Sequence, residues 1–199
     1  PIFYASSLNN LAIIYIKLGN YEKAEPLYLE AKTIQEKALG KEDPNYASSL
    51  NNLATLYNTM GNYEKAEPLF LESKAIREKA LGKEHPDYAI SLLNLGNLYW
   101  EMGNYEKAEP LCLESTTIQE KALGKEHPDY AKNLNNLAIL YKSMGNYEKA
   151  EPLYLEATTI LEKALGKEHP DYATSLNGPA TLYYDMGNYK KAEPLFLET

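Results

Sequence analysis

The sequence predicts an all-α protein built from five consecutive pairs of helices, the last pair truncated. The string G-N-Y-E-K-A-E-P-L begins at Gly19 and returns every 42 residues, with a single change in its last copy. Within each interval, apolar residues follow the spacing of three and four that places side chains on one face of a helix. Self-similarity at a fixed period is typical of repeat proteins, in which each repeat buries its apolar surface against its neighbours.

The first helix of each pair is predicted from the second repeat, where it runs from about Pro44 to Met60. Four residues there follow the i, i+3, i+4, i+7 pattern: Leu50, Leu53, Ala54 and Tyr57. Proline suits the first position of a helix because that position needs no amide hydrogen, and Asp43 before it is a suitable N-cap. Histidine fills the cap position of the later repeats, as His85, His127 and His169.

The second helix is predicted over Tyr63–Leu81, with Asn62 as its cap and Gly61 and Gly82 as the residues that stop the two helices. Pro68 and its equivalents fall inside this helix, where a proline removes one backbone hydrogen bond at a cost of about 3 kcal/mol. Either the helix begins near the proline or it continues through it. We favour a continuous helix with a shallow bend, because the residues on both sides keep one helical phase.

Tyrosine is unusually frequent, with 18 copies against three phenylalanines and one tryptophan. Fifteen of the tyrosines occupy three positions of the repeat, those of Tyr4, Tyr15 and Tyr21, so we expect them to pack between helices. The single cysteine, Cys112, replaces an aromatic residue of the other repeats and is expected to be buried. One cysteine cannot form an internal disulfide, which fits a reducing compartment and a cytoplasmic location.

Composition and spacing argue against several classes of function. The net charge of −8 is unsuited to nucleic-acid binding, and no apolar run approaches the roughly 18 residues of a membrane helix. The histidines recur once per repeat, too far apart to share a metal. Without a nucleophile–base pair or a phosphate-binding glycine loop, we expect no enzyme activity and no cofactor. The Glu- and Lys-rich strings are expected to form a solvated outer face.

The spacing of both helices resembles the tetratricopeptide repeat (TPR) pattern, through Leu50-x2-Leu53-Ala54-x2-Tyr57 and then Ala66-x3-Phe70. The 42-residue period, with L-N-N-L-A in the first helix and A-E-P-L in the second, resembles the kinesin light chain TPR domain and its bacterial relatives. This resemblance implies a right-handed superhelical solenoid, a single array over residues 1–199. Its repeats would cover about 1–43, 44–85, 86–127, 128–169 and 170–199. Because polar capping helices are lacking, we expect a fragment of a longer protein, with end-to-end self-association through its uncapped termini.

The first helix also carries positions that differ between repeats, at the places of Ser48, Asn51, Thr55 and Asn58. Their spacing puts them on one face, here called the first-helix face. In TPR arrays this face lines the concave groove, so the resemblance implies that a peptide or protein ligand binds there. The candidate ligand-binding residues are Asn9, Asn51, Asn52, Asn58, Ile90, Leu93, Asn94, Asn97, Trp100, Lys132, Asn135, Asn136, Lys142 and Tyr184.

Asparagines form a ladder through the first helices, and a carboxamide can both donate to and accept from the backbone of an extended peptide. In TPR proteins, asparagines at matching positions contact the ligand. The alternative is that the second asparagine of each pair, such as Asn52, bridges adjacent helices and only stabilises the stack. Both interpretations stay open for Asn52, whereas for Asn51 we favour a ligand role.

The third repeat adds an apolar stripe to this face: Ile90, Leu93 and Trp100. Lys132 and Lys142 are expected on the neighbouring first helix, opposed by nearby acidic residues, and no arginine is expected in the groove. A tryptophan in a concave site is a typical binding hot spot. Beside lysines it would accept a peptide that combines an apolar or aromatic anchor with acidic residues, as kinesin light chains do. Alternatively, Trp100 packs against a helix edge.

The fifth first helix departs from the pattern, because Asn177-Gly178-Pro179 replaces Asn-Asn-Leu. Pro179 falls in a core position, so we expect a kink or partial fraying and a weaker groove there. The sequence as a whole predicts a non-enzymatic scaffold for protein–protein interaction. Its rivals are a regulatory or sensor array of a larger effector enzyme or signalling ATPase, and a purely architectural, self-assembling module.

Overall fold

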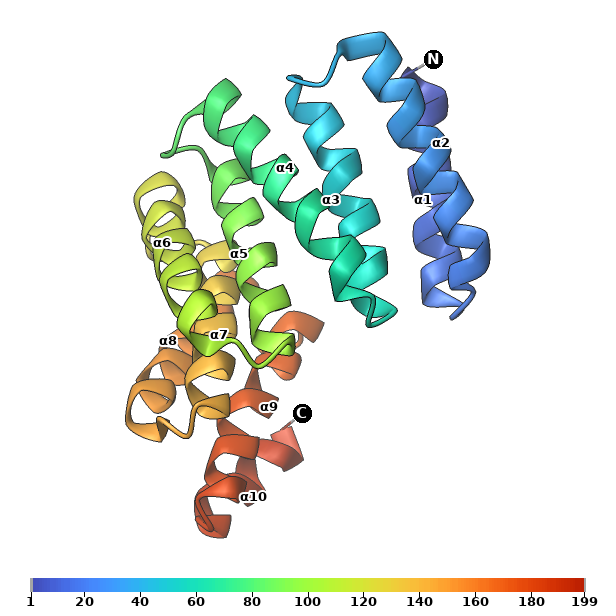
Figure 1. Ribbon diagram of the computed structural model, residues 1–199. Coiled ribbons are helices and arrows are strands. Elements are labelled where there is room, and N and C mark those ends of the chain that lie inside the picture. Colours follow the sequence, from blue (N-terminus) through green and yellow to red (C-terminus); the bar gives the residue numbers. More distant parts are fainter. Residues whose placement is uncertain (1, 199) are drawn as a thin grey trace. The chain divides into compact units, whose positions relative to one another are not determined.

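The computed structural model describes residues 2–198, in which short turns join a series of helices (Figure 1). Ten α-helices follow one another as helix–turn–helix repeats, and no β-strand occurs among the described residues. The first helices are α1 (Ile2–Lys17), α3 (Pro44–Thr59), α5 (Pro86–Glu101), α7 (Pro128–Ser143) and α9 (Pro170–Asp185). The second helices are α2 (Tyr21–Leu39), α4 (Tyr63–Leu81), α6 (Tyr105–Leu123), α8 (Tyr147–Leu165) and α10 (Tyr189–Glu198). The predicted all-α fold of helix pairs is confirmed.

The helix ends are built as the sequence predicts. Asp43 accepts a hydrogen bond from the backbone amide of Asn45 at 2.7 Å, and Nδ1 of His85 accepts one from the amide of Asp87 at 3.1 Å. The same histidine cap recurs in the two later repeats. Gly61 has a φ of 70°, in the left-handed region that favours glycine, so the chain can turn sharply between α3 and α4.

Proline lies inside every second helix, and the helix continues through it in each case. The alternative that these helices begin at the proline is therefore wrong, while the shallow bend stays a prediction. In α9, Pro179 is also interior, yet the helix runs unbroken to Asp185 and the proline ring is buried. The expected fraying is not found, because the ring itself fills the core position that an apolar side chain occupies in other repeats.

By their contacts, the helices form two compact units. Unit 1 ends at Met102 and holds α1 to α5, and unit 2 begins at Gly103 and holds α6 to α10. Within each unit, every helix packs against the next one along the chain. In unit 1, α3 also touches α1 and α5, and in unit 2, α7 touches α9. First helices of neighbouring repeats are thus in direct contact inside each unit.

Tyrosines supply much of the core, as predicted. Copies at the first tyrosine position are almost fully buried in the later repeats: Tyr46, Tyr88, Tyr130 and Tyr172. Copies at the second position are 5–7% exposed: Tyr57, Tyr99, Tyr141 and Tyr183. The third position is only half-buried, as at Tyr63, and the prediction is wrong for its last copy, Tyr189, which is 63% exposed. The prediction is wrong for Tyr4, which is 54% exposed, because no second helix precedes α1 among the described residues to cover it.

The glutamate of each of the first four A-E-P-L strings links its repeat to the next. Tyrosine hydroxyls donate to these carboxylates at 2.7–2.9 Å, in the pairs Tyr57–Glu25, Tyr99–Glu67, Tyr141–Glu109 and Tyr183–Glu151. Lys149 and Lys191 add ion pairs to the last two glutamates. The four glutamates are half-buried, so the expectation of a purely solvated outer face is wrong at this position. Each bond spans 32 residues and therefore ties successive repeats together.

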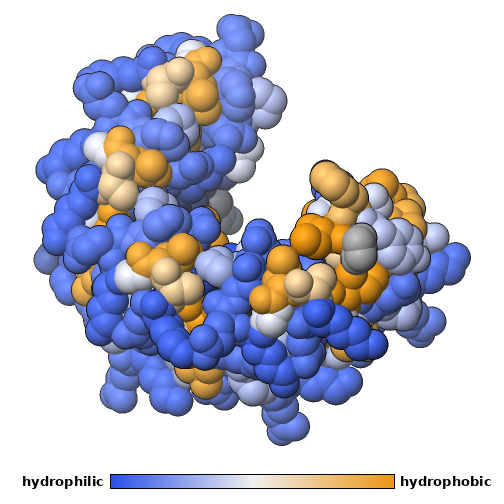
Figure 2. Space-filling view, turned by 90° about the horizontal axis from the view of Figure 1, so that it is seen from above, coloured by the Kyte–Doolittle hydropathy of each residue, from blue (hydrophilic) through white to orange (hydrophobic). Residues whose placement is uncertain are grey.

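Exposed apolar side chains form separate islands on a hydrophilic surface, as the face drawn in Figure 2 shows. Several of them belong to repeated positions and are each 39–47% exposed: Leu29, Leu71, Leu113, Leu155, Met60, Met102, Met144 and Met186. Within residues 2–198, no helix combines the length and the apolar content needed to cross a membrane.

Candidate ligand-binding face and pocket

None of the candidate ligand-binding residues is fully buried. In unit 1, α1 holds Asn9, α3 holds Asn51, Asn52 and Asn58, and α5 holds Ile90, Leu93, Asn94, Asn97 and Trp100. In unit 2, α7 holds Lys132, Asn135, Asn136 and Lys142, and α9 holds Tyr184. Each unit therefore presents its own accessible part of the first-helix face.

In unit 1 the asparagine ladder is a direct contact between first helices. Nδ2 of Asn94 in α5 donates to Oδ1 of Asn51 in α3 at 2.9 Å. This bond is the helix bridge that one of the two open interpretations assigns to the second asparagine of a pair, and it is seen for Asn94, the equivalent of Asn52. The Oδ1 atoms of Asn9 and Asn58 are also buried, and neither has a hydrogen-bond partner among residues 2–198. An unpaired buried oxygen is costly, so each of these carboxamides would be stabilised by a donor that reaches it.

The apolar stripe of α5 is partly accessible. Ile90 is 40% exposed, whereas Leu93 and Trp100 are half-buried. Trp100 is therefore intermediate between an exposed anchor and a core residue, and both interpretations of it stay open. Lys132 and Lys142 belong to unit 2, so their combination with Trp100 stays a prediction.

Arg77, the only arginine of the sequence, reaches the first-helix face from α4. It is 6% exposed, and its Nη1 donates to the carbonyl oxygen of Asp87 at 2.9 Å and to Oγ of Ser91 at 3.0 Å. Nη2 donates to Oγ of Ser48 at 3.0 Å. Burial lowers the pKa of this guanidinium, and the charge of Asp87 opposes the shift. This long side chain extends from the second helix to Ser48 of the first-helix face, and the expectation that no arginine enters the groove stays a prediction.

Unit 2 has an open pocket of about 300 Å³ between α7, α8 and α9. Polar residues and one leucine line it: Lys132, Asn135, Asn136, Leu161, Asp171, Thr174 and Ser175. The structure thus brings together Lys132, Asn135 and Asn136, all three predicted from the sequence. The search confined to first helices missed the contribution of α8. A signal for it exists, since one buried position of the second helices varies between repeats, as Gln35, Arg77, Gln119 and Leu161.

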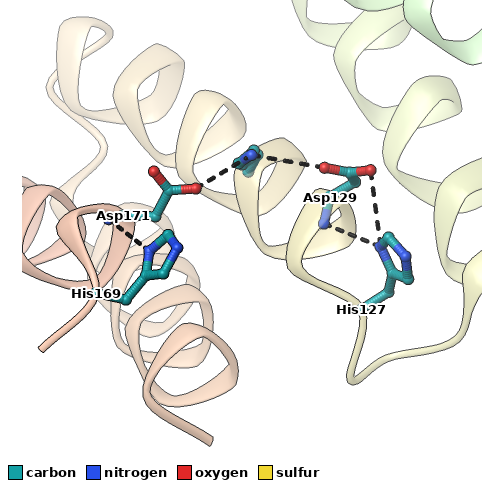
Figure 3. Close-up of polar contacts among 5 residues, drawn as sticks. His127, Asp129, His169 and Asp171 are labelled. Atoms are coloured by element: carbon teal, nitrogen blue, oxygen red, sulfur yellow. Dashed lines mark hydrogen bonds and ion pairs between the residues drawn. The ribbon is translucent and has the colours of Figure 1, made fainter. Parts of the chain in front are cut away.

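Charged side chains surround this pocket. Nζ of Lys132 lies 3.3 Å from Oδ2 of Asp171 and 3.7 Å from Oδ1 of Asp129. Figure 3 shows these two aspartates on either side of the amine, each beside the histidine that caps its helix. The side chain of Lys132 is 54% exposed, so this cation lies at the rim of the pocket.

The other candidates of unit 2 lie near the opposite ends of the same helices. Nζ of Lys142 forms an ion pair with Oδ2 of Asp185 at 2.9 Å. Tyr184 is 59% exposed, and its ring meets Tyr189 edge-on with the ring centroids 5.6 Å apart. The candidates of unit 2 therefore form two groups, of which one lines the pocket.

The side chains of residues 2–198 also bear on metal and thiol chemistry. No group of three or more His, Cys, Asp or Glu residues within the described range could hold a metal ion. Cys112 is buried, as predicted, and burial raises the pKa of its thiol to about 11. At neutral pH this residue is a protonated thiol, which is a poor nucleophile.

The tetratricopeptide repeat family model matches residues 3–79, 46–121, 87–163 and 134–199. Two crystal structures of a protein from Podosopora anserina, assigned as a kinesin light chain with nearly identical TPR-like repeats, are similar at 30% identity. They match over 97% of this chain and 91–92% of their own, with TM-scores of 0.79 and 0.78. BtubC (BKLC) from P. vanneervenii is 26% identical, over 96% of this chain and 76% of its own, with a TM-score of 0.80.

A more distant likeness extends to a Rap protein complexed with Competence and Sporulation Factor. It is 17% identical, over 94% of this chain and 50% of its own, with a TM-score of 0.79, and it shows the fold alone. No curated protein matches the sequence.

Proposed function

Because the chain belongs to the tetratricopeptide repeat family, in its kinesin light chain-like form, we propose that it is a non-catalytic scaffold for protein–protein interaction. It binds a peptide segment of a partner protein along the first-helix face. The observation that carries this proposal is the open pocket on that face in unit 2, where Asn135 and Asn136 border a space that a ligand can enter. Side-chain amides can pair with both the N–H and the C=O groups of an extended peptide.

Unit 1 supports the same function with different chemistry. Asn58 is half-buried on α3, and its carboxamide is of a kind that pairs with a peptide backbone. Ile90 and Trp100 add accessible apolar surface on α5. A few polar groups beside aromatic and aliphatic side chains are typical of sites that fix a peptide in one register.

A peptide array probed with the full chain tests this proposal. We expect a subset of peptides whose affinity falls at least about tenfold in Asn135→Ala or Trp100→Ala, since truncation of a central contact removes about 1.4 kcal/mol or more. Glu30→Ala, an exposed substitution in α2, is the control and should bind as the original chain does. Circular dichroism should show equal helical content in all variants. If no bound peptide depends on either residue, the proposal fails.

A further inference from the structure

We propose that the pocket of unit 2 binds the guanidinium group of an arginine side chain carried by the bound peptide. The inference rests on the proposed function, because the pocket is part of the first-helix face, and it specifies the chemistry that this part selects. Its basis lies within the chain itself. In unit 1, an arginine of the protein already fills the equivalent place.

Arg77 shows how this repeat holds a guanidinium group. Its head group contacts α3 and α5 through three residues, and each of the three has a counterpart two repeats later in the lining of the pocket. The pairs are Ser48 with Lys132, Asp87 with Asp171, and Ser91 with Ser175, while Arg77 itself corresponds to Leu161. The pocket therefore lies where unit 1 places the head group of Arg77.

Leu161 leaves this place open because its side chain is short and apolar. It is 3% exposed and packs in a core cluster with Tyr130, Leu134 and Ile160. The cavity beyond it measures about 300 Å³. That volume is about ten times the roughly 30 Å³ that one water molecule occupies in the liquid, so a planar guanidinium and a few waters fit.

Two of the three groups that accept hydrogen bonds from Arg77 persist in the pocket. Ser175 is 6% exposed, and its hydroxyl donates to the carbonyl oxygen of Tyr172 at 2.7 Å, which leaves lone pairs on Oγ to accept. Asp171 offers a backbone carbonyl at the place where that of Asp87 accepts from Arg77, and its carboxylate corresponds to that of Asp87, whose charge favours the charged guanidinium. A guanidinium carries five N–H donors in a flat fork, which suits several acceptors at different angles.

The third acceptor, the hydroxyl of Ser48, is replaced by the cation of Lys132. A carboxylate ligand is therefore the alternative to a guanidinium. Lys132 would attract a carboxylate, but Asp171 and Asp129 lie within 3.7 Å of the lysine amine and would repel it. A guanidinium would form an ion pair with Asp171, and it would displace the solvated amine of Lys132 from the rim of the pocket. The three charges sum to −1, and the whole chain carries −8, so the local and the long-range field both favour the cation.

Titration of the full chain with N-acetyl-L-arginine amide, followed by NMR amide shifts, tests the proposal. We expect saturable shifts around the pocket, at Ser175 and Asn135, with a dissociation constant on the order of 1 mM. N-acetyl-L-citrulline amide has nearly the same shape without the charge and should bind about tenfold more weakly. Equal binding of these two probes, or tighter binding of N-acetyl-L-glutamate amide, would overturn the proposal.

Lys132→Ser copies the residue of unit 1 and separates the two ligand chemistries. The substitution restores a hydroxyl acceptor and removes a repelling charge, so the arginine probe should bind about fivefold more tightly. Because Lys132 is exposed, the thermal unfolding temperature should stay the same. Weaker binding of the arginine probe by this variant would show that the lysine serves an anionic ligand and would refute our assignment.

Leu161→Arg supplies the guanidinium from within the chain. The folded variant should no longer respond to the arginine probe, because its own head group occupies the pocket. Leu161→Glu is the matched control with a charge of opposite sign, and it should unfold at a lower temperature than Leu161→Arg. If Leu161→Arg still binds the probe, or is as unstable as Leu161→Glu, the pocket does not accept a guanidinium.

The peptides selected on the array distinguish this inference from the proposed function. Replacing one arginine of such a peptide by citrulline should weaken its binding about tenfold in the original chain and leave it unchanged in Leu161→Arg. Peptides that bind through Asn135 or Trp100 without any dependence on an arginine would leave the scaffold function standing and would overturn the arginine pocket alone.

Discussion

The helices α4 and α8 differ at the buried position that Arg77 occupies in α4 and Leu161 in α8, and this difference changes the surface that the first helices of each unit offer. Arg77 of α4 fills the space between α3 and α5 and donates hydrogen bonds to both. Leu161 of α8 leaves an open pocket between α7 and α9. The surrounding polar groups are similar in the two places. The residue on the second helix therefore decides whether this part of the first-helix face is closed or open.

A buried position on a second helix can thus encode binding. Stacking requires only that the stem of the side chain pack against the core, and the aliphatic stem of an arginine does this as well as a leucine. The end of the side chain can then vary between repeats, as Gln35, Arg77, Gln119 and Leu161 do. An array of this kind can change its ligand face without any change in its first helices.

The largest expected effect is one that both units share. Burial raises the pKa of three tyrosines in each unit to about 12: Tyr46, Tyr57 and Tyr99 in unit 1, and Tyr130, Tyr141 and Tyr154 in unit 2. In the unfolded chain these phenols ionise near the ordinary value of 10. Their contribution to stability is therefore complete below pH 10 and is lost as the pH rises toward 12, where both units should unfold.

Each unit carries its own reporter for this experiment. Trp100, the only tryptophan, reports unit 1 by fluorescence, and Cys112, the only cysteine, reports unit 2 by thiol labelling referred to the unfolded chain. We expect coincident transitions, since the tyrosine cores are alike. Unfolding of one unit well below pH 10 would show that the units differ in more than the pocket.

Arg77→Ala should destabilise unit 1. The substitution leaves a cavity and removes the donor to Ser48 and Ser91, so we expect a loss of about 3 kcal/mol in the free energy of unfolding. Urea unfolding followed by Trp100 fluorescence measures it, and labelling of Cys112 should shift less.

Arg77→Leu copies unit 2 and is the matched control. Because it keeps the apolar stem, it should cost only about 1 kcal/mol. It should also create a second site for N-acetyl-L-arginine amide in unit 1. Equal stability of the original chain and Arg77→Ala would mean that the buried guanidinium contributes nothing to the fold.

Gly178→Ala should destabilise unit 2. A Cβ at Gly178 would lie 2.5 Å from two ring carbons of Tyr154, whereas the same position in unit 1 carries Asn94. We expect this overpacking to cost about 2 kcal/mol in thermal or urea unfolding, despite the better helix propensity of alanine. Asn177→Ala, an exposed change in the same helix, should instead stabilise slightly. Equal behaviour of the two variants would show that the Tyr154 ring moves aside at no cost.

The helices could be predicted because their boundaries depend on local signals. Pro44 begins α3 and Asp43 caps it, through contacts that span two residues. The bond between Tyr99 and Glu67 was not predicted, because a glutamate on a helix is indistinguishable from a solvated one until the neighbouring helix is known. Helix boundaries can therefore be predicted from local sequence, whereas the contacts between helices are known only once the helices are packed together.

The candidate site could be predicted only in part. Differences between first helices indicated Lys132 and Asn135, which do line the pocket. They could not indicate Leu161, because a pocket arises from missing side-chain volume where three helices meet, and a leucine in a helix is an ordinary core residue. Comparison of the second helices at this one position would have found both Arg77 and the pocket.

The bonds between repeats should have equal effects in both units. Tyr99→Phe in unit 1 and Tyr141→Phe in unit 2 each remove a hydroxyl that donates to a half-buried glutamate at 2.7 and 2.9 Å. We expect each to cost about 1 kcal/mol in urea unfolding. Tyr184→Phe, at an exposed phenol, is the control and should be neutral. A cost in only one unit would show that the repeats are joined unequally.

The smallest effect concerns the two candidate lysines of unit 2. Lys142 pairs with Asp185 at 2.9 Å, with side chains 24% and 41% exposed, so Lys142→Ala should cost only about 0.5 kcal/mol, and high salt should reduce this cost. Lys132, with a 54% exposed side chain, should matter even less for folding. A large loss of stability in either alanine variant would contradict this. If the free energy of unfolding hardly changes, neither lysine is needed for the stability of the fold. Any effect of Lys132 on arginine binding can then be ascribed to the pocket itself.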